Sequence, residues 1–214
     1  MAVTKQLAIW IIGTNSSGKT SLARFLHEEL QDAAGYRKWG GEFIRWPHEA
    51  SGKYCGYTRF SAFSANLGKL DGAACGGTDT LNSKAQIIES LEVANEKVPI
   101  VILEGIMATA TWIDFLKTDR RKVFLVHLDI NEEANLSRLR ARRGVKAGIA
   151  PHLVEITQET QEKLASKRKT FRNLYGKMEG LVDYAIQLST ENLTPRQVQK
   201  KVWRSFGKFM NQSF

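Results

Sequence analysis

The sequence predicts an α/β fold in which helices cover both faces of a parallel sheet of about five strands. Short, continuous apolar runs, typical of strands buried on both faces, occupy residues 7–13, 99–103 and 122–130. Segments with apolar residues at helical spacing lie between them, at 19–32 and 83–96. Strands that alternate with helices indicate a three-layer α/β/α arrangement, which binds its ligand at the carboxyl ends of the strands.

Length and composition favour one domain that spans residues 1–214, with 43% hydrophobic residues to form its core. No apolar run reaches the length of a membrane span, and the run at 7–13 ends in a glycine loop, as a first strand does, without a signal cleavage site. Cys55 and Cys75 lack CxxC spacing or paired histidines, so no structural zinc is expected. Free thiols in a reducing cytoplasm are expected, although one disulfide is possible.

The remaining elements follow from the same patterns. Further strands are predicted at 42–46 and 182–188, and helices at 111–117, at 131–143 with its end at Gly144, over most of 152–175, and at 194–211 with Pro195 first. Between them, residues 47–82 are rich in glycine, serine and aromatic residues and show no clear period, except for a short helical piece near 61–67. So long a loop is unusual in a compact domain and is typically functional.

The run Gly13-Thr-Asn-Ser-Ser-Gly18-Lys19-Thr20 matches the phosphate-loop motif G-x-x-x-x-G-K-[ST], after a predicted strand and at the start of a predicted helix. The glycines permit a tight turn whose N–H groups surround phosphate oxygens. Lys19 supplies a charge for the terminal phosphates, and Thr20 a hydroxyl for Mg²⁺. An ordinary strand–turn–helix corner is the alternative. The residues expected to bind ATP are Gly13, Asn15, Ser16, Ser17, Gly18, Lys19, Thr20 and Ser21.

Two carboxylates are candidates for chemistry. Glu104 ends a buried strand, where it could hold Mg²⁺ or orient an acceptor, or instead form a salt bridge to a helix end. Asp79, in Gly-Gly-Thr-Asp-Thr, is either a helix N-cap or a general base that takes the proton of a substrate hydroxyl, with Asp71 a weaker alternative. The chain lacks the NKxD motif of GTPases, and its strand ends in the single Glu104 followed by glycine, where motor ATPases have an acidic pair. Together with the small size and a basic helix at the expected lid position, this favours a kinase.

Residues 129–144 resemble the lid of small-molecule and nucleoside monophosphate kinases of the gluconate, shikimate and adenylate kinase type. In such lids a strand that ends near an aspartate enters a helix rich in arginine, here within a basic helical region at 131–176. Arg138 and Arg142 are four residues apart and share a helix face that could clamp the transferred phosphoryl group. The alternative is a charged face in contact with solvent only.

The segment 47–82 is where such kinases build the acceptor site. The residues expected to bind the substrate are Arg45, Tyr57, Arg59, Phe60 and Thr78. Aromatic residues interleaved with arginines suit a planar base and its phosphates, although they could simply pack the segment. The net charge of +9 favours an anionic partner, and the basic residues of 131–176 and 194–211 exceed what a free metabolite needs.

The combination resembles bacteriophage kinases that phosphorylate 5-hydroxymethyluracil within DNA. The resemblance rests on the GTNSSGKT loop, the GGTDT element at Asp79, the LEG strand end at Glu104 and the arginine lid, and would cover most of the chain. It implies ATP as donor, the hydroxymethyl group of a DNA base as acceptor, and Asp79 as the general base. A target base in duplex DNA can require rotation out of the stack. The alternatives are a small-molecule or nucleoside monophosphate kinase and a non-catalytic, nucleotide-dependent DNA-binding module.

Overall fold

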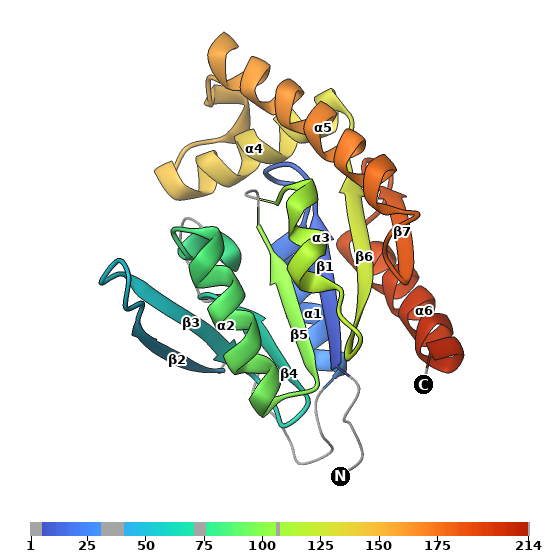
Figure 1. Cartoon of the computed structure of the whole chain (residues 1–214). Helices are drawn as coiled ribbons and strands as arrows, with labels where there is room; N and C mark the ends of the chain where they lie inside the picture. The colour runs from blue at the N-terminus through green and yellow to red at the C-terminus, as the bar shows by residue number, and fades with distance from the viewer. Residues whose placement is uncertain (1–5, 31–40, 71–75, 106–107, 214) are drawn as a thin grey trace.

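The computed structural model describes residues 6–30, 41–70, 76–105 and 108–213. Its strands are β1 (Gln6–Ile12), β2 (Glu42–Pro47), β3 (Tyr54–Arg59), β4 (Ser64–Leu67), β5 (Ile100–Glu104), β6 (Arg121–Asp129) and β7 (Tyr184–Ser189). Its α-helices are α1 (Lys19–Glu29), α2 (Lys84–Lys97), α3 (Ile113–Leu116), α4 (Glu132–Ala147), α5 (Gln158–Met178) and α6 (Pro195–Ser213). Short 3-10 turns are η1 (Thr78–Thr80), η2 (Ala110–Trp112) and η3 (Pro151–Leu153). The strands form one sheet in the order β2-β3-β4-β5-β1-β6-β7 (Figure 1).

The α/β fold is confirmed, but the sheet has seven strands where about five were expected. The five strands β4, β5, β1, β6 and β7 are parallel, and β2 and β3 extend one edge in antiparallel pairing. The expected long loop at 47–82 was therefore wrong in part, because β3 and β4 lie within it. Residues 61–67 contain strand β4 where a helical piece was expected. Small and polar residues fill this buried strand, so its sequence lacks the apolar run that revealed the other central strands.

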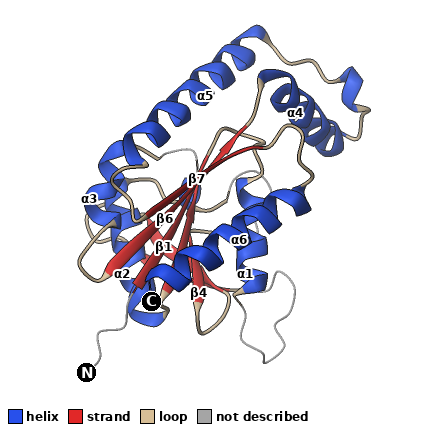
Figure 2. Cartoon of the chain, turned by 90° about the vertical axis from the view of Figure 1, so that its right-hand side faces the viewer, coloured by secondary structure: helices blue, strands red, loops and turns tan. Residues whose placement is uncertain are grey.

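Helices cover both faces of the sheet, as expected (Figures 1 and 2). On β1, Ala8, Trp10 and Ile12 pack in the core beneath α2, α3 and α5. The alternate residues Leu7, Ile9 and Ile11 pack in the core formed with α1 and α6. This alternation explains why β1 is apolar throughout, since each of its faces is buried by a different helical layer.

Beyond the carboxyl ends of the strands, α4 lies across the top of the sheet and α5 leads back along it (Figure 1). A small apolar cluster joins the two helices, formed by Leu139, Val154, Ile156 and Leu164. The predicted end of α4 at Gly144 was wrong, because the helix continues to Ala147 and Gly148 ends it in the left-handed conformation. The long helix predicted from 152 begins only at Gln158, where Thr157 caps it.

The other predicted elements agree with the structure within a few residues. Helix α2 begins where expected, and the side chain of Ser83 caps it by accepting a hydrogen bond from Gln86 N. The predicted first helix, 19–32, ends at Glu29 within the described part of the chain. Asp71 and Cys75 lie outside the described residues, whereas Cys55 is buried as a free thiol.

Candidate active site

The backbone angles of the loop between β1 and α1 restrict which residues can occupy its positions. Gly13 and Gly18 have φ values of 149° and 103°, in a region that favours glycine. A Cβ atom on Gly13 would lie 2.6 Å from Leu128 O, so no larger residue fits there. Ser16 has a φ of 63°, and a left-handed residue that is not glycine costs about 1 kcal/mol. The loop therefore holds a strained conformation at Ser16 between two glycines that other residues could not easily replace.

The loop also buries hydroxyl groups that pair with nothing in the described structure. These are the hydroxyls of Thr14, Ser16 and Ser17. A buried polar group left without a partner costs about 1–3 kcal/mol. Phosphate oxygens would accept hydrogen bonds from such hydroxyls, and the start of α1 adds a favourable dipole. The loop is thus built to receive an anion.

Lys19 is buried under the loop. Its Nζ donates to Gly13 O at 2.9 Å and to Thr14 O at 3.0 Å. Burial lowers the pKa of Lys19, while the charges of Glu104 and Asp79 oppose that shift. The ammonium group is therefore held against the backbone at the start of the phosphate loop.

Thr20 and Glu104 meet although 84 residues separate them. Glu104 ends β5, which pairs with β1, and the Thr20 hydroxyl donates to Glu104 Oε1 at 3.1 Å. Burial raises the pKa of Glu104, against the effects of the Lys19 charge and the Thr20 hydrogen bond. A hydroxyl and a carboxylate beside phosphate oxygens are ligands of the kind that Mg²⁺ prefers, so this pair fits the expected metal site.

The Gly-Gly-Thr-Asp-Thr segment packs directly on Glu104. A Cβ atom on Gly77, whose φ is +61°, would lie 2.2 Å from Glu104 O, so only glycine permits this approach. Thr78 is buried, and its hydroxyl donates to Glu104 O at 3.0 Å. Thr78 thus supports the strand end, although it was predicted to bind substrate.

Asp79 lies beside this strand end as well. Its Oδ1 would be 2.8 Å from a Cβ atom on Gly105, the residue that follows Glu104. Its charge also acts on the pKa values of both Lys19 and Glu104. Since Ser83 caps α2, the alternative role of Asp79 as cap of that helix falls away. The fold therefore brings Lys19, Asp79 and Glu104 together.

The two lid arginines have different surroundings. Arg138 donates from Nη1 to Thr190 Oγ1 at 3.2 Å, and from Nη2 to the carbonyl oxygen of Thr190, just after β7. Arg142 is exposed, and its positive charge contributes to the lowered pKa of Lys19. The α5 residue Lys167 contributes in the same way. Arg138 is thus engaged at the end of β7, whereas the charge of Arg142 acts on Lys19.

Beside the loop lies a cavity of about 230 Å³. Its lining includes the loop residues Ser16 to Gly18 and Arg138. Apolar side chains from α1, from the turn before α6 and from the start of α6 complete it, namely Leu22, Leu193, Pro195 and Val198. An apolar slot with a planar cation on one wall suits a nucleobase. The α6 side of this cavity was not predicted, because the short run Leu193 to Pro195 carries no recognisable binding motif.

A polar chain connects the lid to the phosphate loop and was also missed. Asn135 of α4 donates to Asn15 O at 2.7 Å, and Arg168 of α5 donates to Asn135 Oδ1 at 3.2 Å. Arg168 also contacts Glu132 at 2.8 Å. The signal in the sequence is Asn135 itself, four residues before the buried Leu139 and therefore on the inner side of the helix.

The residues predicted to bind substrate are divided between core and surface. Tyr57 packs against Trp46, and Phe60 stacks on His27 at 3.9 Å between ring centroids. Both Tyr57 and Phe60 are buried, so neither ring offers a free face to a ligand, and the structure corrects that expectation. Arg45 and Arg59 are exposed, and the Arg45 guanidinium lies 4.6 Å from the ring centroid of Tyr54.

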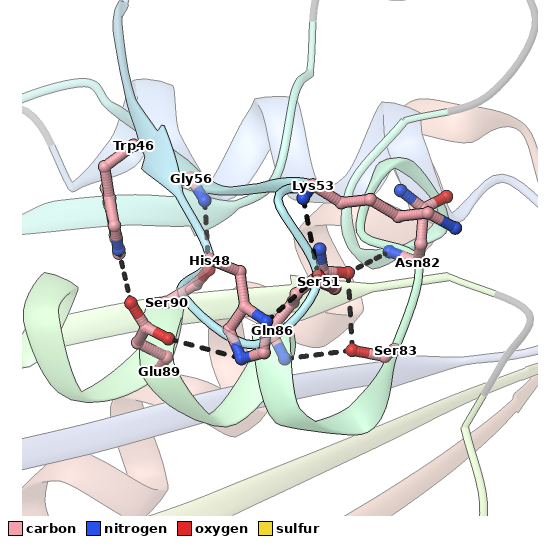
Figure 3. A network of polar contacts seen from close by, with 10 residues as sticks. All are labelled: Trp46, His48, Ser51, Lys53, Gly56, Asn82, Ser83, Gln86, Glu89 and Ser90. Atoms are coloured by element: carbon pink, nitrogen blue, oxygen red, sulfur yellow. Dashed lines mark hydrogen bonds and ion pairs between the residues drawn. The ribbon is translucent and has the colours of Figure 1, made fainter.

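A polar network holds the β2–β3 hairpin on α2 (Figure 3). Trp46 Nε1 donates to Glu89 Oε1 at 2.5 Å, and His48 Nε2 lies 3.6 Å from Glu89 Oε2. The backbone N–H of Gly56 donates to Ser90 Oγ at 3.0 Å. Because α2 follows Asp79 closely in the chain, these contacts fix the hairpin relative to the candidate site.

Comparison with known proteins gives a partial likeness. No protein-family profile matches the chain. A stretch of 50 residues is 44% identical to the cytochrome c biogenesis ATP-binding export protein CcmA of Rhodospirillum rubrum, over 23% of this chain and 22% of CcmA. The chain thus matches about a fifth of that protein's length. Together with the loop geometry, this likeness supports nucleotide binding by a P-loop protein and does not identify a family.

Two searches of the described residues are negative. They contain no helix long and apolar enough to cross a bilayer. Nor do these residues include a group of three or more histidine, cysteine, aspartate or glutamate side chains placed to hold a metal ion.

Proposed function

We propose that this protein is an ATP-dependent kinase that transfers the γ-phosphoryl group to an alcohol. The observation that carries the proposal is the meeting of Thr20 and Glu104 beside Lys19, with Asp79 next to them. A binding module needs the phosphate loop alone. A second carboxylate near the terminal-phosphate position is what a phosphotransferase requires to receive the acceptor's proton.

In the proposed reaction, the loop holds ATP with its base in the cavity near Arg138. Lys19 leaves its backbone acceptors for the terminal phosphates. Thr20 and Glu104 would hold Mg²⁺, which neutralises phosphate charge. Asp79 accepts the proton of the acceptor hydroxyl. The hydroxyl oxygen then forms a bond to the γ-phosphorus, and the bond between that phosphorus and the ADP oxygen breaks. Arg142 stabilises the charge on the transferred group.

The proposed acceptor is the hydroxymethyl group of 5-hydroxymethyluracil in DNA. Support comes from the resemblance in the GGTDT element, whose aspartate lies beside Glu104, and from the net charge of +9. The exposed Arg45 and Arg59 extend the basic surface along the hairpin. A smaller alcohol is the second candidate, because burial of Tyr57 and Phe60 removes two rings that would stack on a base.

Transfer of labelled γ-phosphate tests the acceptor. The panel holds duplex and single-stranded DNA with 5-hydroxymethyluracil, matched DNA with thymine, and the free nucleoside and nucleotide. We expect label in DNA only where the hydroxymethyl base is present, and none with Lys19→Ala. Label in the free nucleotide but not in DNA would reject the DNA acceptor and support the second candidate.

A further inference from the structure

The far end of α4 carries exposed aliphatic side chains that the fold does not use. Val145 is 86% exposed, Ile149 45% and Leu153 63%. They lie where α4 ends and η3 begins, and η3 packs against α4. We call residues 145–153 the lid tip. Exposed apolar side chains gathered in one short segment are candidates for contact with a partner.

The backbone of the lid tip is well defined. Ile149 N donates to Gly144 O at 3.0 Å, and Gly148 N donates to Val145 O at 3.4 Å, around a left-handed Gly148. In this type of helix end, the residue just after the left-handed glycine, here Ile149, usually packs on the side chain four residues before that glycine, here position 144. Glycine there offers no side chain, and a Cβ atom would lie 2.7 Å from Ile149 O. The tight turn therefore leaves Ile149 without its usual apolar contact.

The lid tip itself carries positive charge and no carboxylate, and Glu155 lies just beyond it, in a hollow that it lines together with Arg140. From residue 134 to 154 the chain has no aspartate or glutamate. Its cationic residues there are Arg138, Arg140, Arg142, Arg143 and Lys146. A second copy of the chain would meet the same positive charge, which disfavours self-association at this surface. A polyanion with an apolar interior complements it, and duplex DNA is one.

The lid tip continues directly from the part of α4 that carries Arg142. Val145 follows Arg142 by less than one helical turn, and the Arg142 charge acts on Lys19. An acceptor base placed at Asp79 would thus leave its neighbours in the stack near α4. Nothing in the proposed reaction places a membrane surface beside the phosphate loop. We therefore take nucleic acid as the partner that contacts the lid tip.

We propose that the lid tip is a wedge, in which Ile149, flanked by Val145 and Leu153, enters the base stack of duplex DNA. The wedge occupies space left by the base that turns toward Asp79, and Arg140, Arg143 and Lys146, which have no part in the proposed ATP site, contact the DNA phosphates. The proposal rests on the proposed function insofar as the acceptor is a base in DNA. Removal of a base from the stack costs free energy, and an inserted apolar side chain replaces part of the lost contact.

Replacement of Ile149 by serine tests the wedge. Leu181→Ser is the matched control, because Leu181 is 50% exposed and lies in the turn between α5 and β7, away from the lid tip. One readout is the fluorescence of 2-aminopurine beside the target base in a duplex, without ATP. The other is the rate of phosphorylation of duplex and of single-stranded DNA.

We expect Ile149→Ser to abolish most of the fluorescence rise and to slow duplex phosphorylation by about tenfold or more, with single-stranded DNA unaffected. Leu181→Ser should match the wild type in both. Circular dichroism checks that both variants fold, which the exposure of both side chains predicts.

Other outcomes overturn the wedge. Equal loss on duplex and single strand would assign Ile149 to the shape of the lid, and no loss would leave it without a role. A wild-type dimer that Ile149→Ser converts to monomers would assign the surface to a second copy. Binding to anionic vesicles that Ile149→Ser abolishes, with duplex opening unchanged, would assign it to lipid. If the wild-type protein opens duplexes but transfers no phosphate, the kinase proposal is rejected and the wedge is retained. If the wild-type protein binds no DNA, the wedge is rejected.

Discussion

Lys19 and Glu104 carry opposite charges in one buried site. Burial lowers the pKa of Lys19 and raises that of Glu104, and both shifts favour the neutral form of the side chain. Each also favours the charged form of the other. The pair is therefore poised between desolvation and mutual attraction, and bound phosphates with their metal ion would shift the balance toward charge. Chemistry at this site depends on a few atoms that the rest of the fold holds in place.

Glu104→Gln tests the proposed metal ligand. Glutamine preserves the volume and can still accept the Thr20 hydrogen bond, but it supplies no negative charge. We expect kcat to fall by about 100-fold or more, because the variant lacks a charge that holds Mg²⁺ on the phosphates. Steady-state phosphoryl transfer measures this. Glu96→Gln, exposed on α2, serves as control. Full activity in Glu104→Gln would remove Glu104 from the metal site.

Because His27 is buried, we predict that the free energy of unfolding falls in acid. Its ring is buried, and burial lowers its pKa to about 3. Since the unfolded chain takes up this proton near pH 6.5, the folded protein binds fewer protons between these values. Stability should therefore fall as the pH falls through this window, by about 2 kcal/mol from this group between about pH 7 and pH 5.

Urea unfolding at the two pH values measures the effect. His27→Gln removes the titrating group and keeps an amide that can bond to Ser64, the partner of the His27 ring. The pH dependence should become shallower in the variant. It should not vanish, because burial also lowers the pKa of His127, to about 4. An unchanged pH dependence would show that His27 is not the sensitive group.

At the scale of elements, α4 is the piece that connects the lid to the nucleotide. It reaches the phosphate loop through Asn135, the cavity through Arg138 and the reaction centre through Arg142. These residues recur every three or four positions, so they share one side of the helix. Movement of α4 would therefore change all three contacts at once.

Asn135→Ala tests that connection. The variant removes the hydrogen bond to Asn15 O and leaves the buried Arg168 without one acceptor. We expect ATP affinity to fall by about tenfold, because the loop loses a support and a buried group loses its partner. Isothermal titration gives the affinity, and Ser137→Ala, exposed on the same helix, is the control. Equal affinities would separate the lid from the loop.

The sequence predicted elements whose burial shows as an apolar period, and it failed where burial falls on small or polar residues. β1, β5 and β6 are clear apolar runs, whereas β4 reads Ser-Ala-Asn-Leu and was missed. The same limit applies to the site. The phosphate loop is a local motif, but Tyr57 and Phe60 are core residues because α2 and His27 cover them, which local sequence does not show.

Over the whole molecule, the basic residues differ in whether they pair with carboxylates or are available to a polyanion. Three basic residues of α5 pair with carboxylates: Lys163 with Glu159, Arg168 with Glu132 and Arg172 with Asp129. The lid tip and α6 are the stronger candidates for contact with a polyanion. On α6, Arg196, Lys200 and Arg204 line a groove together with Trp203. Cations beside an aromatic ring suit a nucleic-acid backbone and its bases.

Salt dependence tests this distribution. If three or more of these cations contact phosphates, DNA affinity should fall by about 30-fold or more between about 50 and about 200 mM salt. Fluorescence anisotropy across that range gives the slope. Lys200→Ala together with Arg204→Ala should make the slope shallower, while Lys163→Ala should leave it unchanged. A flat response in the wild type would contradict a DNA-binding surface.

The destination of the γ-phosphate of ATP decides whether this protein is the proposed kinase. With wild-type protein, Mg²⁺ and DNA that contains 5-hydroxymethyluracil, we expect the phosphate to appear covalently on the DNA, and Asp79→Asn and Lys19→Ala each to suppress its appearance. Release of the phosphate to water at the same rate with or without an alcohol acceptor would show that the protein is an ATPase and not this kinase.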